Sequence, residues 1–400
     1  MPTHDARFGE PHMVAEHDTW ISLDPVIGCP ADCAYCYLGP LRLKARRPMQ
    51  RVDTASAGGL LRAYLYGRRS ELIDPDTDTT PICLGNYTDM LMTRDNRRAL
   101  LGILAEITSI LSPRLLVLIT KSALDKETVN AIDGFGWPVL WFFSQSFAFL
   151  KQGRLELGRV ADFDTTIGNA ELVTTTTNQR AAHFWRPFVR ELIPPLAERH
   201  RIVERLKGSG MQCSVVLGMA RGPGTPAEDR RLHEAMPSAF ESDPVGSEVI
   251  DREAWREIST VARRAGYPMY RHSSCAIALA QSRPEQLGTW GGVAASERCL
   301  PCQCPSVQRR RCGSRKEQAA DQVHMRSFAD EVAKFLELES GEITYDVAKG
   351  LIHIHASVAE FDYNTILHAA SGRYLISARS IATQKAWQGS FATVYSKQKD

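Results

Sequence analysis

Short apolar runs alternate with amphipathic stretches from about residue 18 to residue 275. Each run has the length of a buried strand, and the stretches between the runs have the spacing of surface helices. Strands that alternate with helices favour parallel βαβ units. The six predicted strands are TWISL (19–23), PICLG (81–85), LLVLIT (115–120), PVLWFFS (138–144), AHFWRPF (182–188) and CSVVLGM (213–219).

Two of the amphipathic stretches show helical spacing most clearly. They are NRRALLGILAEITSI (96–110) and RHRIVERLKGSG (199–210), and the second ends at glycines that predict its stop. GYPMYRHSS (266–274) is predicted to add a further strand, whereas residues 220–250 are rich in Pro, Gly and acidic residues and are predicted to form a loop. Six βα units predict a partial (β/α)6 barrel over residues 1–274.

The pattern changes after the predicted barrel. Residues 275–320 are Cys-rich and show little periodicity, so we expect a metal-binding segment there. Beyond them, FADEVAKFLEL (328–338) and EFDYNTILHAA (360–370) have helical spacing, and EITYDV and LIHIHAS alternate as a β-hairpin does. Residues 321–400 are therefore predicted to form a small α+β domain.

The composition, 44% hydrophobic and 24% charged, is that of a globular protein. The sequence shows no membrane-spanning run and no signal-peptide pattern, so we expect a cytoplasmic protein. The net charge of +2 is unevenly spread, because eight Arg or Lys residues and one acid lie between Arg42 and Arg69. Such a segment suits a phosphate-bearing partner, and it is equally consistent with a solvated helix face.

The cysteines indicate the chemistry. Three of the ten lie in the motif Cys29-x-x-x-Cys33-x-x-Cys36, directly after the first predicted strand. In a reducing compartment, clustered cysteines bind metal more often than they form disulfides. Iron–sulfur clusters are ordinarily held by four thiolates, so three leave one iron open to the amino and carboxylate groups of S-adenosylmethionine (SAM). A zinc knuckle is the alternative, but its fourth ligand is missing, and Tyr35 or Tyr37 would serve poorly.

Four stretches match a known family in the expected order: GCPADCAYCYLGP (28–40), LGNYTDMLM (84–92), LITKSAL (118–124) and RIVERLKGSGMQCSVVLG (201–218). Through them, residues 19–220 resemble radical SAM enzymes and, among these, the spore photoproduct lyase-like group. The resemblance implies a radical SAM barrel and a [4Fe–4S] cluster that cleaves SAM reductively to a 5′-deoxyadenosyl radical. It also implies hydrogen abstraction from an organic substrate and a one-electron donor such as flavodoxin or ferredoxin.

The same resemblance implies cofactor contacts for single residues. Lys121 stands where the family has a lysine near the SAM carboxylate, and Ser144 matches a hydroxyl that contacts the methionine or ribose part of SAM. Tyr35, the aromatic residue before the last cysteine of the motif, is expected beside the cofactor. The turn that receives the amino group of SAM contains Gly85, Asn86, Thr88 and Asp89.

Two residues are candidates for chemistry on the substrate. Spore photoproduct lyase uses a cysteine near the end of the second strand as a hydrogen-atom donor. Cys83 lies near the corresponding position, but Asn86 occupies the position itself, and this departure argues against thymine-dimer repair. Arg186, at the end of a predicted strand, is expected to pair with a carboxylate or phosphate of cofactor or substrate.

A second set of cysteines lies in the Cys-rich segment and comprises Cys275, Cys299, Cys302, Cys304 and Cys312. Four of these thiols could close a Cys₄ metal site. Many radical SAM enzymes carry auxiliary clusters in C-terminal extensions, so a second [4Fe–4S] cluster is our first expectation. A structural Zn²⁺ is the alternative, because Cys₄ zinc sites use similar spacings.

The sequence leaves the substrate open. The resemblance and the basic segment favour a nucleic acid or nucleotide. The departure at Asn86, the extra cysteines and the appended domain favour a small metabolite or peptide. A different class is a non-catalytic iron–sulfur or zinc protein that binds a partner through residues 321–400. Formation of 5′-deoxyadenosine from SAM would distinguish the enzyme from the binding protein.

Overall fold

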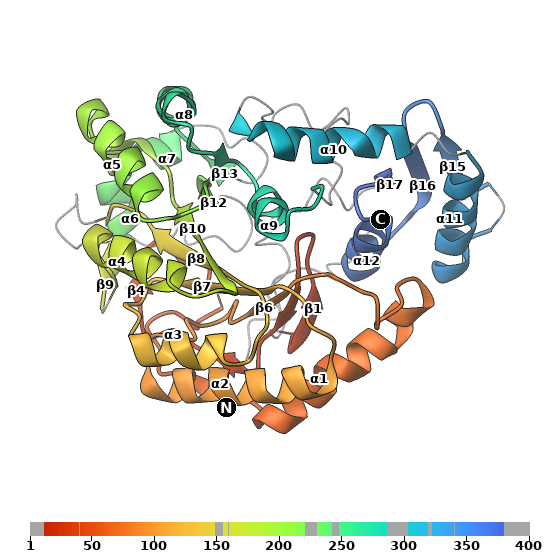
Figure 1. Ribbon diagram of the computed structural model, residues 1–400, viewed down its shortest axis with the longest axis horizontal. Coiled ribbons are helices and arrows are strands. Elements are labelled where there is room, and N and C mark those ends of the chain that lie inside the picture. Colours follow the sequence, from red (N-terminus) through yellow and green to blue (C-terminus); the bar gives the residue numbers. More distant parts are fainter. Residues whose placement is uncertain are drawn as a thin grey trace.

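The computed structural model describes residues 12–39, 41–148, 155–158, 160–220, 230–241, 248–285, 303–318, 322–339 and 341–379. An eight-stranded sheet has the order β1-β2-β6-β7-β8-β10-β11-β14, and Figure 1 labels β1, β6, β7, β8 and β10 of it. Strand β1 is antiparallel to β2, and every later pair of neighbours is parallel. The strands are β1 (Val14–Glu16), β2 (Ile21–Leu23), β6 (Ile82–Leu84), β7 (Leu116–Thr120), β8 (Val139–Gln145), β10 (Gln179–Trp185), β11 (Ser214–Val216) and β14 (Met269–Tyr270).

Helices connect the successive parallel strands. They are α1 (Thr54–Tyr66), α2 (Arg94–Ile110), α3 (Lys126–Asp133), α4 (Phe163–Thr174), α5 (Leu196–Gly208) and α8 (Arg252–Ala265). All but α5 begin after an Asp or Thr whose side chain accepts a hydrogen bond from a backbone N–H of the first turn. Within the described residues, none of the helices has both the length and the apolar character needed to cross a membrane.

The two faces of the sheet bury different side chains, because side chains alternate along each strand. One face packs against the connecting helices and includes Leu116, Leu118 and Trp141. The other, which we call the α9 face, is covered by α9 (Ser273–Gln281). The α9 face consists of Trp20, Cys83, Leu115, Val117, Leu140, Phe142, Ala182, Phe184, Cys213, Val215 and Tyr270, with Ala276 and Ile277 of α9 itself.

The C-terminal unit has its own hydrophobic core. It contains α11 (Gln322–Phe335), β15 (Ile343–Asp346), β16 (Leu351–Ser357), α12 (Glu360–Ala370) and β17 (Leu375–Arg379). Strand β16 is antiparallel to β15 and parallel to β17. In Figure 1 the unit is blue and lies on the other side of the molecule from α4 and α5.

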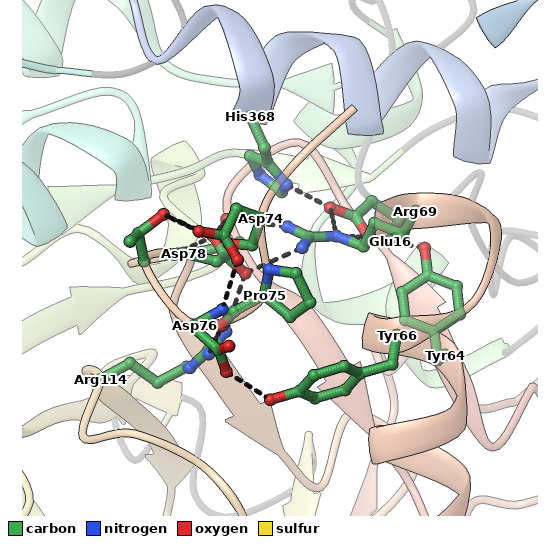
Figure 2. A network of polar contacts seen from close by, with 12 residues as sticks. Glu16, Tyr64, Tyr66, Arg69, Asp74, Pro75, Asp76, Asp78, Arg114 and His368 are labelled. Carbon is green, nitrogen blue, oxygen red and sulfur yellow. Dashed lines mark hydrogen bonds and ion pairs between the residues drawn. The ribbon is translucent and has the colours of Figure 1, made fainter. Parts of the chain in front are cut away.

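A buried ionic network joins this unit to the first strand (Figure 2). We call Glu16, Arg69, Asp78, Arg114 and His368 the docking network. Glu16 of β1 pairs with Arg69 at 3.0 Å and with His368 of α12. Asp78 accepts from both guanidiniums, with Oδ2 2.8 Å from Nη1 of Arg69 and 2.8 Å from Nη1 of Arg114. Residues far apart in the sequence are thus held together by charge.

The parallel sheet, the helices at α2, α5 and α12 and the C-terminal hairpin confirm the sequence predictions. The predicted loop at 220–250 is wrong in part, because it contains α6 (Arg230–Ala235), α7 (Ser238–Glu241) and β13 (Glu248–Val249). Strand β13 pairs with β12 (Met219–Ala220). A pair of two-residue strands has no periodicity to detect. Helix α10 (Ser306–Gln318) likewise lies in the segment that shows little periodicity.

Candidate functional site

The three cysteines of the first motif lie on residues 28–48, which we call the cysteine loop. Strands β3 (Val26–Ile27) and β5 (Met49–Gln50) flank the loop and pair antiparallel, so they close its base. Inside the loop, the backbone N–H of Cys29 donates to the carbonyl oxygen of Leu43 at 2.8 Å. Gly28 has φ +92°, and a Cβ there would lie 3.0 Å from the carbonyl oxygen of Arg47. Glycine is therefore required where the loop begins.

The thiols of this loop are largely withdrawn from solvent. Cys29 and Cys33 are 9% and 4% exposed, and Cys36 is partly buried. Burial raises the pKa of each thiol, to about 12 for Cys29. Cys29, Cys33 and Cys36 pack in one cluster of side chains, and charge on Cys36 raises the pKa of the other two thiols. The positive charges of Arg186 and Lys121 act in the opposite sense on Cys36.

The arrangement of these thiols suits an iron–sulfur cluster better than a single metal ion. Among the residues that the structure describes, no three His, Cys, Asp or Glu side chains are grouped as ligands of one metal ion. An iron–sulfur cluster places each thiolate on a different iron, so its ligands stand further apart than those of a single ion. Three neighbouring thiols beside two cations are a donor set that fits such a cluster, because the cations offset thiolate charge.

Lys121 follows β7 directly and reaches the cysteine loop. Its Nζ lies 2.9 Å from Oε1 of Glu156 and 3.3 Å from the carbonyl oxygen of Ser144. The Tyr35 hydroxyl donates to the same Glu156 oxygen, and Nζ is 5.5 Å from the Tyr35 ring centroid. Burial lowers the pKa of Lys121, but Glu156 and the Cys33 thiol outweigh burial and raise it. Three predicted cofactor residues, Tyr35, Lys121 and Ser144, are thus brought together.

Glu156 belongs to a short strand that the sequence analysis did not identify. Strand β9 (Glu156–Leu157) pairs antiparallel with β4 (Asp32–Cys33), and Glu156 stands opposite Cys33. The residue lies between two stretches outside the described residues and belongs to no apolar run, so the sequence carries no local signal for it. Its position depends on pairing with the cysteine loop and on the contact with Lys121, both of which are long-range.

Asp89, predicted near the amino group of SAM, binds the connection between β7 and α3 through several hydrogen bonds. The carboxylate accepts from the Thr120 hydroxyl at 2.9 Å, from the Lys121 backbone N–H at 2.8 Å and from the Ser122 hydroxyl at 3.2 Å. Asp89 is 7% exposed, and burial raises its pKa. These hydrogen bonds occupy much of the accepting capacity of the carboxylate.

The other turn residues bind the turn to its surroundings. Thr88 Oγ1 donates to the carbonyl oxygen of Gly28 at 2.6 Å, which ties the turn to the cysteine loop. The backbone N–H of Asn86 donates to Oδ1 of Asp24 at 2.6 Å. Gly85 has φ +89°, and a Cβ there would lie 2.5 Å from a Met90 side-chain carbon. The turn therefore lies beside the motif.

Cys83 lies on the α9 face, three residues before Asn86. Its Sγ is 3.8 Å from Oδ1 of Asn86, and burial raises the pKa of the thiol well above its ordinary value. Burial also raises the pKa of Asp24, which is fully buried beside it, to about 6. The hydroxyl of Tyr37, from the cysteine loop, donates to the carbonyl oxygen of Asn86. Cys83 is thus connected to the loop through Asn86 and Tyr37.

Arg186 follows β10 and also faces the cysteine loop. Its guanidinium carbon is 5.9 Å from the Tyr37 ring centroid. Burial lowers the pKa of Arg186 to about 10, and charge on Tyr37, Glu248 and Cys36 opposes this change. A cation is thus maintained at the carboxyl end of the sheet, close to the thiols.

Of the second cysteine set, Cys299 and Cys302 lie outside the described residues. Cys275, on α9, and Cys304 pack against the α9 face. Cys312, on α10, accepts hydrogen bonds from the Glu285 N–H and the Gln308 amide, each at 3.5 Å.

Cys213 joins this group, although the sequence analysis left it isolated. Cys213 and Tyr270 are buried in the α9 face, and Cys275 and Cys304 pack against that face. Burial and charge on these three thiols raise the pKa of Tyr270. The signal was present in the sequence. Alternation along the predicted strand CSVVLGM (213–219) places Cys213 and Val215 on one face.

Comparison with known proteins gives structural neighbours but no sequence relatives. No protein-family model matches the chain, and no curated protein matches it. Spore photoproduct lyase complexed with dinucleoside spore photoproduct is 14% identical, with 66% of this chain and 76% of that chain covered and a TM-score of 0.47. HydG, a maturase of the [FeFe]-hydrogenase, is 10% identical, with 81% and 83% covered and a TM-score of 0.39.

A third neighbour is the radical SAM methyltransferase TsrM from Kitasatospora setae. It is 13% identical, with 92% of this chain and 60% of that chain covered and a TM-score of 0.40. The structural neighbours of this chain, spore photoproduct lyase, HydG and TsrM, are all radical SAM enzymes.

Proposed function

We propose that this chain is a radical SAM enzyme. The observation that carries the proposal is the grouping of three thiols with Lys121 and Arg186 at the carboxyl end of parallel strands, which is where ligands bind in parallel α/β folds. We propose further that the sheet is the partial barrel of this class. When bound, a [4Fe–4S] cluster would supply the electron that cleaves SAM to methionine and a 5′-deoxyadenosyl radical.

In this proposal the cysteine loop and Lys121 have different roles. Cys29, Cys33 and Cys36 hold the cluster and leave one iron open to the amino and carboxylate groups of SAM. Lys121 binds the SAM carboxylate through its buried ammonium, because a charge-assisted hydrogen bond is strongest where water is scarce. Tyr35 covers Lys121 and excludes water from it.

Two residues face the substrate in this proposal. Arg186 binds an anionic group of the substrate, because its cation lies beside the thiols. Cys83, whose burial keeps the thiol protonated, would give a hydrogen atom to the substrate radical, and one electron from the one-electron donor and a proton would return the resulting thiyl radical to the thiol. The substrate is an organic molecule that carries a phosphate or carboxylate, and a nucleic acid or nucleotide is the class we favour.

The exposed part of the basic segment supports this substrate class. Arg42, Arg46 and Arg47 are exposed on the cysteine loop, whereas Arg69 is only 3% exposed and belongs to the docking network. We expect binding of DNA or RNA to weaken steeply with salt, and reversal of Arg46 and Arg47 to Glu to flatten that dependence by roughly one to two slope units. If the wild type shows only weak, non-specific binding at about 150 mM salt, the substrate is a small metabolite or peptide.

We also propose a second [4Fe–4S] cluster on four of Cys275, Cys299, Cys302, Cys304 and Cys312. Metal and sulfide analysis after anaerobic reconstitution should give two clusters per chain. One cluster with about one equivalent of zinc would replace the second cluster by a structural Cys₄ zinc site.

The function is tested by mixing the reconstituted protein anaerobically with SAM and a one-electron reductant. We expect dithionite, or a physiological donor such as flavodoxin or ferredoxin, to yield 5′-deoxyadenosine and methionine. If the reductant reduces the cluster but no 5′-deoxyadenosine forms, the chain is a binding protein, contrary to the proposal.

A further inference from the structure

Lys121 and Glu156 form an ion pair beside the cysteine loop. The two side chains are only 15% and 10% exposed, and their charged atoms are 2.9 Å apart. Strand pairing holds Glu156 opposite Cys33, and β7 ends just before Lys121. Two opposite charges are therefore fixed by separate parts of the fold at one place beside the thiols.

The hydrogen-bonding capacity of this pair is not filled by the protein. An ammonium has three donors, and a carboxylate has about four acceptor sites. Within the ranges that the structure describes, Lys121 donates to Glu156 and to the carbonyl oxygen of Ser144. Glu156 accepts from Lys121, Tyr35 and Ser146. One donor of the ammonium and about one acceptor site of the carboxylate remain for a ligand.

A ligand that fits such a pair carries an acceptor and a donor on neighbouring atoms. The amino-acid end of SAM has this chemistry, because its carboxylate and amino groups stand on one carbon. An amino nitrogen that donates an N–H to a carboxylate also keeps its lone pair, so the contact is compatible with metal coordination.

We propose that Lys121 and Glu156 together receive the amino-acid end of SAM, with Lys121 on the carboxylate and Glu156 on the amino group. The inference rests on the proposed function and departs from the resemblance in one respect. The resemblance places the amino group at the turn with Asp89, but Asp89 already holds Thr120, Ser122 and the Lys121 backbone. Glu156 takes over that role from a different segment of the chain.

The test is equilibrium dialysis of the reconstituted full-length protein, without reductant, against SAM and two analogues. One analogue lacks the α-amino group and the other lacks the α-carboxylate. We expect Glu156→Gln to weaken SAM binding by roughly ten- to a hundredfold and to leave the affinity for the analogue without the amino group unchanged. Lys121→Met should weaken SAM binding similarly and leave the analogue without the carboxylate unaffected.

Matched controls lie on the neighbouring helix α3, where Lys126 and Glu127 are exposed. Lys126→Met and Glu127→Gln should change none of the three affinities. An analogue that still binds a variant as it binds the wild type also shows that the variant is folded.

Several outcomes would overturn the inference. Unchanged or tighter SAM binding by Glu156→Gln would mean that Glu156 only competes for Lys121. Equal losses for SAM and for the analogue without the amino group would mean a structural role. If the wild type itself binds no SAM, the proposed function fails together with the inference, whereas the first two outcomes leave the proposed function intact.

Discussion

Two regions of the molecule bury ionisable groups but balance their charges differently. One is the docking network. The other, which we call the cysteine edge, consists of the three thiols with Asp24, Lys121, Glu156 and Arg186. In the docking network each carboxylate faces a guanidinium, and Glu16 and Arg69 are 0% and 3% exposed (Figure 2). Burial alone raises the pKa of Glu16, but Arg69 and His368 outweigh burial and hold it at about 2. The network is balanced by its own members.

At the cysteine edge Lys121 and Glu156 also balance each other, but for the thiols and Asp24 burial dominates. It raises the pKa of the Cys29 thiol to about 12 and that of Asp24 to about 6. The thiolate form that a metal needs is therefore unfavourable until a positively charged centre arrives. The comparison teaches that charge pairing in the docking network serves the fold, whereas the unbalanced groups of the cysteine edge are those that we propose serve a ligand.

Substitution of Arg69 is the strongest test of charge pairing in the docking network. Arg69→Met leaves Glu16 and Asp78 buried without their shared cation, and removal of one partner from a buried pair costs about 3–5 kcal/mol. We expect this loss in the free energy of unfolding, measured with urea. A loss below about 1 kcal/mol would show that the network contributes no more than a surface pair.

The pH dependence of the free energy of unfolding tests the charge pairing of Glu16. Its pKa is about 2 in the folded chain and 4.5 ordinarily, so the folded state releases the proton more readily. The resulting stabilisation, about 3 kcal/mol, is present above pH 4.5 and is lost as the pH falls toward 2. We expect Glu16→Gln to lack this acid-dependent loss. Parallel stability profiles of variant and wild type between these pH values would contradict the account.

Asp24 should show the opposite sign. Its pKa rises from 3.8 to about 6 on folding, so the folded state holds the proton more tightly. Stability of the apoprotein should then fall by about 3 kcal/mol as the pH rises from 3.8 to about 6. Asp24→Asn removes the titrating group, and chemical denaturation at several pH values should show that the variant lacks this loss. The prediction fails if the variant keeps the slope of the wild type.

The smallest effect is expected at Arg68, the neighbour of Arg69. Arg68 pairs with Asp362 of α12 at 3.5 Å, but the Arg68 side chain is 55% exposed. Exposed ion pairs contribute about 0–1 kcal/mol, so Arg68→Met should lower the free energy of unfolding by less than about 1 kcal/mol. Because the two arginines are adjacent, this variant is also the matched control for Arg69→Met. Equal losses for the two variants would remove the distinction between buried and exposed pairing.

Local sequence patterns account for the sheet and for much of the site. The apolar runs predict the parallel strands, and the parallel order alone brings Lys121 and Arg186 to the edge where the motif lies. The spacing of the three cysteines predicts a common loop, and in the structure the three pack in one cluster of side chains.

Long-range pairing accounts for what the sequence analysis missed. Glu156 is placed by a two-residue strand opposite Cys33, and no local pattern encodes that partner. Glu16 and His368 meet across 352 positions of sequence, so neither residue indicates the contact by itself. Arg69 belongs to the basic segment in the sequence, but in the structure it is buried and pairs with Glu16 and Asp78 of the docking network.

The central claim is that Cys29, Cys33 and Cys36 hold the cluster that cleaves SAM. The most direct measurement is the iron content and 5′-deoxyadenosine yield of the triple variant with all three replaced by Ala, beside the wild type after identical anaerobic reconstitution. We expect the variant to lose one cluster's worth of iron and all 5′-deoxyadenosine formation, and to keep the fold defined by the docking network. A triple variant that still cleaves SAM would contradict the account.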